Sequence, residues 1–184
     1  MSNQRQMPFC ELLPFVRYAR SMYVSQGEYP VLTAAYDCRL FYVTKGQGEM
    51  IVANSTYRLH KGDLLFWQPG IPYRMDTAGD KTLQFIALNF DLTQTFRHRD
   101  YPIPPVKLPL FQQNEILEII CFTDVPRLND PVHLQGMQGL EETLNEIKIE
   151  DQSKKAFFRE RMSGLTLSIM SSIVRKLALG KNED

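Results

Sequence analysis

Residues 62–73 read GDLLFWQPGIPY, and this stretch decides the fold. A Gly-Asp pair precedes the apolar run LLFW, and the run is followed by Pro-Gly-Ile-Pro. Glycine, aspartate and proline are the residues that favour tight turns. A short run of leucine and aromatic residues between two turn signals is typical of a buried β-strand. The stretch therefore predicts a short strand held between two tight turns.

Similar segments lie on both sides of this stretch. Turn residues recur at intervals of roughly ten positions, as in antiparallel sandwiches and barrels. The segment YPIPPVKLP contains four prolines, so we expect an edge strand or a crossing loop there. The expected strands are LFYVT, EMIVA, YRLH and LQFIALNF, and the expected turns include Lys45–Gly48, Asn54-Ser55 and Lys61-Gly62.

The last third of the chain changes to a helical period. Ser153 is a plausible N-cap for a helix that runs to Leu179, with Gly180 after it. Apolar residues at three- and four-residue steps mark one face of each of two helices. Core packing and a seam with a second helix both explain the longer face. The faces are Leu134, Met137, Leu140, Leu144 and Ile147, then Phe158, Met162, Leu165, Ile169, Ile173 and Leu177. We expect an N-terminal arm over residues 1–28, a barrel over 29–110 and a helical region over 111–184.

Composition and motifs exclude several classes of function. The chain of 184 residues carries 21 basic and 21 acidic residues, so no net charge attracts it to nucleic acid or to anionic lipid. Three widely spaced cysteines, with no long apolar segment, predict reduced thiols and a cytoplasmic protein. Dinucleotide-binding, P-loop and hydrolase motifs do not occur in the sequence.

Three segments carry a resemblance to a known family. They are RLFYVTKGQGEM, YRLHKGDLLFWQPGIPYRM and LQFIALNFDLTQ, and two expected helices follow them. The stretch from Asp37 to Phe90 resembles a cupin, and more narrowly the effector-binding domain of AraC-type transcription regulators. The resemblance implies a mainly β fold with C-terminal α-helices, namely a cupin-like antiparallel jelly-roll barrel followed by two helices.

The positions at which metal-binding cupins carry their ligands are substituted in this chain. The glutamate position falls at Arg39 and the last histidine position at Tyr73. The two other histidine positions fall at Thr33 and Ala35, or one residue earlier. A guanidinium among these groups would repel a divalent cation. We therefore expect neither a metal nor another cofactor.

The same substitutions suggest a different kind of pocket. Strand alternation points Arg39 and Tyr73 into the barrel, with Phe41 and Met75 as apolar walls on the same parity. A buried arginine needs a partner, which is either a ligand or a protein group such as Asp37, Glu49 or a carbonyl. The resemblance adds Phe85 and Ala87 on the cavity side. The expected ligand-binding residues are Thr33, Arg39, Phe41, Tyr73, Met75, Phe85 and Ala87.

The resemblance implies a domain that binds a small sugar-like or other polar effector and dimerises, without being an enzyme. Dimerisation is expected through Met162, Leu165, Ile169, Ile173 and Leu177 of the last helix. DNA contact is expected only from a C-terminal helix-turn-helix part outside these 184 residues. A metal-independent cupin enzyme, such as a sugar epimerase or isomerase, is the alternative, with Tyr73 as its acid and His60 as a poor candidate base. An interaction module that binds no ligand is the third possibility.

Overall fold

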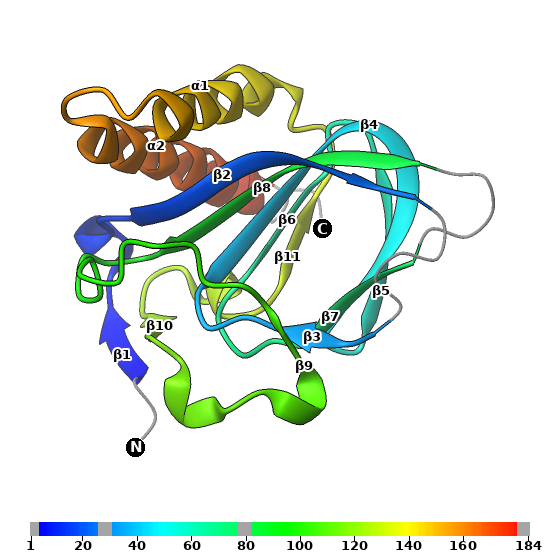
Figure 1. The fold of residues 1–184 in the computed structure, drawn as a ribbon, viewed down its shortest axis with the longest axis horizontal. Coiled ribbons are helices and arrows are strands. Elements are labelled where there is room, and N and C mark those ends of the chain that lie inside the picture. The colour runs from blue at the N-terminus through cyan, green and yellow to red at the C-terminus, as the bar shows by residue number, and fades with distance from the viewer. Residues whose placement is uncertain (1–3, 26–30, 77–81, 180–184) are drawn as a thin grey trace.

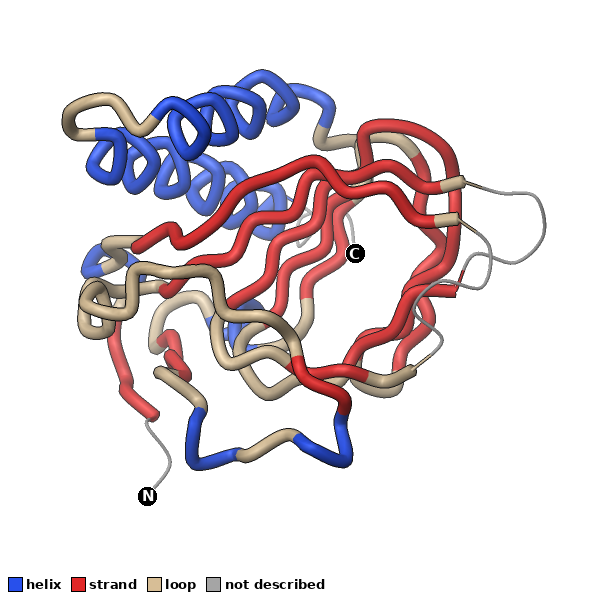
Figure 2. Tube along the Cα trace, viewed as in Figure 1, coloured by secondary structure: helices blue, strands red, loops and turns tan. Residues whose placement is uncertain are grey.

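A computed structural model describes residues 4–25, 31–76 and 82–179. A strongly bent antiparallel sheet forms a barrel, and two helices pack on one outer face of it (Figures 1 and 2). The architecture confirms the predicted fold class. Its strands are β1 (Gln4–Met7), β2 (Phe15–Val24), β3 (Thr33–Ala34), β4 (Cys38–Val52), β5 (Ser55–His60), β6 (Leu64–Trp67), β7 (Tyr73–Asp76), β8 (Leu83–Asp91), β9 (Val106–Lys107), β10 (Ile119–Phe122) and β11 (Val132–Leu134), and its helices are α1 (Glu141–Ser153) and α2 (Phe158–Leu179).

Strand β4 joins the two halves of the barrel. Its first part pairs with β6 and β8, and its second part pairs with β5 and β7. The turn predicted at Lys45–Gly48 is therefore wrong, because the chain bends there without reversing. The register shifts between Val43 and Lys45, and Gly46 has a φ of 85°. A bulge beside a glycine in this conformation bends a strand around the corner of a barrel.

The two faces of the sheet bury two separate apolar clusters. One cluster lies between the barrel and the helices, and it includes Leu40, Phe66 and Ile86. The other lies inside the barrel and includes Phe41 and Trp67. Alternating residues of one strand thus serve different cores, as the period of two requires.

The N-terminal segment is part of the sheet. Strand β2 pairs with β8 from Phe15 to Val24, and β1 forms a small parallel sheet with β10. Residues 15–24, which were assigned to an arm by the sequence, thus contribute a wall of the barrel.

The helical boundaries differ from the prediction. Leu134 belongs to β11, which pairs with β6, and this pairing places His133 in the barrel sheet. Ser153 is the last residue of α1 and caps no helix. Lys154 and Phe157 have left-handed backbone conformations, which end α1 and turn the chain into α2. The expected C-terminal glycine, Gly180, lies outside the described residues. Neither described helix has the length and apolar character needed to cross a membrane.

The apolar stripe of α2 lies mostly inside the chain's own core. Met162, Ile169 and Ile173 are fully buried under the sheet and α1. Leu165 and Leu177 are half-buried and pack against the same cluster. Core packing therefore accounts for the stripe, and its three buried members are not available to a second chain. Dimerisation itself stays a prediction.

Candidate functional site

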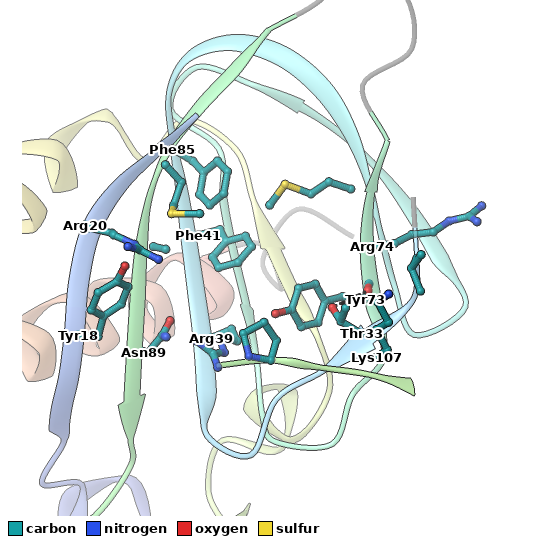
Figure 3. Close-up of a pocket in the computed structure, with 15 residues that line it drawn as sticks. Tyr18, Arg20, Thr33, Arg39, Phe41, Tyr73, Arg74, Phe85, Asn89 and Lys107 are labelled. Carbon is teal, nitrogen blue, oxygen red and sulfur yellow. Dashed lines mark hydrogen bonds between the residues drawn. The ribbon is translucent and has the colours of Figure 1, made fainter. Parts of the chain in front are cut away.

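A cavity of about 300 Å³ lies inside the barrel. All seven residues that we expect to bind a ligand line this cavity (Figure 3). Their role in binding stays a prediction. The full lining is Tyr18, Arg20, Met22, Val31, Thr33, Arg39, Phe41, Tyr73, Arg74, Met75, Phe85, Ala87, Asn89, Pro105 and Lys107.

One wall of the cavity consists of three rows across neighbouring strands of the sheet. We define the polar row as Tyr18, Asn89 and Arg39, which are paired in register on β2, β8 and β4. Two residues away on each strand, the middle row is Arg20, Ala87 and Phe41. The apolar row is Met22, Phe85 and Val43, of which the first two line the cavity. The wall therefore changes from polar to apolar along the strands.

The opposite wall comes from the second half of the barrel. Tyr73 on β7 pairs with Thr33 on β3, and the Thr33 hydroxyl donates to the Tyr73 carbonyl oxygen over 3.3 Å. The Tyr73 ring packs against Trp67, with ring centroids 4.9 Å apart, and meets Phe41 edge-on. Figure 3 shows the Tyr73 hydroxyl inside the cavity, toward the first wall.

Arg39 is held by protein groups at the polar end. Its Nη2 atom lies 2.9 Å from Asp37 Oδ1 and donates to the Ile103 carbonyl oxygen over 2.9 Å. Both pairings are among the protein partners that the sequence left open for this arginine. Burial raises the pKa of Asp37 from 3.8 to about 6, while the positive charge of Arg39 opposes the rise.

A second buried ion pair lies next to the first. Arg17 Nη2 is 2.5 Å from Asp91 Oδ2, and Arg17 Nε donates to the Arg99 carbonyl oxygen. Burial raises the pKa of Asp91, and the hydrogen bond from Arg17 opposes this. The charges of Arg17 and Asp91 also act on Asp37. Two carboxylates and two guanidinium groups thus balance one another beneath the polar row.

The residues at the positions that the resemblance assigns to metal ligands do not fit a metal ion. Arg39 places a guanidinium beside the cavity, and Tyr73 and Thr33 supply hydroxyl groups in place of imidazole ligands. Among the described residues, no three His, Cys, Asp or Glu side chains come together as a metal site would require. Gln68, directly after β6, donates a hydrogen bond to the Ile120 carbonyl oxygen and accepts one from the Ile120 backbone N–H, and so ties the end of β6 to β10.

The described lining of the cavity contains no imidazole and no carboxylate. His60 is mostly exposed and is not part of the lining. Asp63 accepts a hydrogen bond from the His60 backbone N–H and thereby caps the turn at Lys61-Gly62. The acid and base pair that the enzyme alternative requires is therefore not found among these residues.

Sequence reasoning missed five polar residues of the lining. They are Tyr18, Arg20, Arg74, Asn89 and Lys107. Tyr18 and Arg20 lie in the segment taken for an arm. The two-residue alternation of Tyr18, Arg20 and Met22 is the signal that would have placed them on one face of a strand.

Comparison with known proteins identifies the barrel. Residues 25–89 match the sequence profile of the family described as Cupin domain. The barrel therefore has the cupin fold. None of the curated proteins matches the chain in sequence.

Solved structures that are similar to part of this chain share little sequence with it. The 11S globulin procruciferin from Brassica napus is 17% identical, with a TM-score of 0.42, over 49% of this chain and 26% of its own. A cupin protein from Bacteroides fragilis is 14% identical, with a TM-score of 0.35, over 51% of this chain and 68% of its own. A DMSP lyase from Ruegeria pomeroyi is 21% identical, with a TM-score of 0.41, over 51% of this chain and 44% of its own. The chain thus spans about a quarter of the globulin and less than half of the lyase.

Proposed function

We propose that this chain is the effector-binding and dimerisation domain of an AraC-type transcription regulator. The observation that carries the proposal is the cavity inside the cupin barrel, with seven residues at the positions expected for ligand contact. Such concave sites, with apolar walls and a few converging polar groups, are typical of small-molecule binding. DNA contact belongs, in this proposal, to helix-turn-helix motifs outside these 184 residues.

The chemistry of the cavity supports binding without turnover. Its described polar groups are guanidinium, ammonium, hydroxyl and amide groups, which orient a ligand through hydrogen bonds. General acid and base catalysis needs a group that takes up a proton near neutral pH, usually an imidazole or a carboxylate. A bound effector acts by favouring one arrangement of the domain over another, which requires different affinities for the two arrangements.

The binding part of the proposal is tested by filling the cavity. Ala87 lies in the middle row between Arg20 and Phe41, so Ala87→Phe places a ring in the space for a ligand. Ala156→Phe adds the same ring at an exposed turn and is the matched control. Sugars, polyols and organic acids are screened by NMR titration. We expect a hit to bind saturably, unchanged over hours, to the original and Ala156→Phe proteins and not to Ala87→Phe. Equal binding to all three, or conversion of the compound, would contradict the proposal.

The regulator part is tested separately by reading the coding sequence after codon 184. Two helix-turn-helix motifs there support the assignment, and a stop codon overturns it while leaving ligand binding untouched. Dimerisation in this proposal uses half-buried residues of α2, such as Leu165 and Leu177. Sedimentation at micromolar concentration tests it, and a monomer contradicts it.

A further inference from the structure

The polar row contains a series of buried polar atoms without partners. Tyr18 Oη, Asn89 Oδ1 and Arg39 Nε are buried, and none has a hydrogen-bond partner among the described residues. Trp67 is in register with Arg39 on β6, and its Nε1 atom is also buried without a hydrogen-bond partner among these residues, although Trp67 is not part of the cavity lining. Leaving a buried polar group unsatisfied costs roughly 1–3 kcal/mol, so the three such atoms of the polar row call for an occupant.

These atoms are mainly donors. Arg39 Nε can only donate, and the Tyr18 hydroxyl can donate as well as accept. The Asn89 side chain presents its Oδ1 acceptor to the row, and a rotation of the amide group by 180° presents its NH₂ donor instead. Arg39 is fixed by Asp37 and by the Ile103 carbonyl through Nη2, which leaves Nε for another partner. A group that accepts several hydrogen bonds fits this row best.

The charges around the cavity favour the same kind of group. Its described lining has four cationic side chains, Arg20, Arg39, Arg74 and Lys107, and no acidic one. Figure 3 shows the Arg74 side chain extending away from the cavity, so three cations remain near it. Asp37 balances Arg39, whereas Arg20 and Lys107 have no ion-pair partner among the described residues. The site therefore carries an excess of positive charge.

The far end of the wall suits an apolar body. The rings of Phe41 and Phe85 pack at a tilt with their centroids 4.7 Å apart, and Met22 and Met75 complete this part of the lining. The polar and apolar rows are four residues apart along a strand, which corresponds to about 13 Å. A small molecule with a charged head and an apolar body matches this length and this gradient.

We infer that the cavity binds a small organic carboxylate with an apolar, ring-sized body. Its carboxylate accepts hydrogen bonds from the polar row, and its body lies against Phe41, Phe85 and Met22. The inference rests on the proposed function and names the class of its effector. Such a ligand differs from a neutral sugar because it carries a negative charge and an apolar body.

The test compares hydrocinnamate, a carboxylate with a phenyl ring, with its neutral amide and with arabinose. Affinities come from NMR titration of protein labelled at the methionine methyl groups. Charge-assisted hydrogen bonds from a buried row predict that the carboxylate binds about tenfold or more tightly than the amide. Contacts between the phenyl ring and the Met22 methyl group are expected in the complex.

Variants distinguish the effect of hydrogen bonds from the polar row from the effect of positive charge elsewhere on the protein. Arg39→Met and Tyr18→Phe each remove a donor from the row, and both should reduce the preference for the carboxylate. Arg58→Gln removes an exposed cation on β5, outside the cavity, and should leave the preference unchanged. If Arg39→Met does not fold, Tyr18→Phe and Arg20→Gln decide the outcome. Equal or weaker binding of the carboxylate, or an unchanged preference in both deciding variants, overturns the inference.

The outcomes distinguish this inference from the proposed function. If arabinose or the amide binds in the cavity and the carboxylate is not preferred, the proposed effector-binding function is supported and the inference of an anionic effector is wrong. If none of the three compounds binds and the broader screen also finds no ligand, both the proposed function and the inference are wrong.

Discussion

The side chains of Asp37 and Arg39 meet 2.9 Å apart inside the protein, and neither is more than 3% exposed. Asp37 immediately precedes β4, and Arg39 is the second residue of that strand. The pair fixes the guanidinium group at the polar end of the cavity. Bringing both charges out of water is costly, and the cost appears in the pKa of the carboxyl group.

The first prediction concerns the titration of Asp37. Burial raises its pKa to about 6, and Arg39 limits the rise. In Arg39→Met protein the limit is lost, so the pKa of Asp37 should be higher than in the original protein. Carbon-detected NMR of the side-chain carboxyl group measures both values. Arg58→Met is the control and should change nothing, and a value near 3.8 in the original protein contradicts the prediction.

The second prediction follows from the sign of this shift. The pKa of Asp37 is higher in the folded state than its ordinary value of 3.8, so the folded state binds the proton more tightly. The contribution of this group to the free energy of unfolding is complete below about pH 4 and decreases toward about pH 6. Urea denaturation should show that, as the pH rises from about 4 to about 6, the original protein loses stability relative to Asp37→Asn. A constant difference between the two proteins would contradict the expected linkage.

The barrel and much of its cavity were predictable because both depend on the alternation of residues along strands. Arg39, Phe41, Tyr73 and Met75 line the cavity on the parity that the sequence predicts. The bend at Gly46 was not predictable, since glycine and lysine signal a turn as readily as a bulge.

Other features depended on pairing between distant segments. His133 enters the sheet because β11 pairs with β6, and Tyr18 enters the cavity wall because β2 pairs with β8. No local pattern reveals such partners. The stripe of α2 was ambiguous for a related reason, because an apolar helix face looks the same whether its own chain or a second one covers it.

The third prediction tests the bend in β4. A Cβ atom at Gly46 would lie 1.9 Å from the Thr82 carbonyl oxygen, and the φ of 85° disfavours any other residue. Gly46→Ala should therefore reduce the free energy of unfolding by about 2 kcal/mol or more. Gly164→Ala in α2 is the matched control, because nothing lies within 4 Å of the added atom. That change should stabilise the helix by up to about 1 kcal/mol. Urea denaturation of both variants checks the opposite signs.

The fourth prediction concerns metal content. Arg39 and Tyr73 stand at two positions where metal-binding cupins carry ligands, and Arg39 brings a positive charge. Elemental analysis of tag-free protein should find no stoichiometric zinc, iron, manganese or nickel. Replacing Arg39 by glutamate restores only one ligand, so this variant should also remain without metal. One metal ion per chain in the original protein would contradict the prediction.

The last prediction separates the two explanations of the α2 stripe. Ile169 is fully buried within one chain, whereas Ser168, its neighbour on the helix, is exposed. Ile169→Asp introduces an unpaired charge into the apolar core and should cost more than about 4 kcal/mol of stability. Ser168→Asp adds the same charge one residue away, on the solvent side, and should change stability by less than about 0.5 kcal/mol. Thermal denaturation and sedimentation are measured on both variants. An Ile169→Asp protein that stays folded but separates into monomers would instead assign the stripe to a dimer interface.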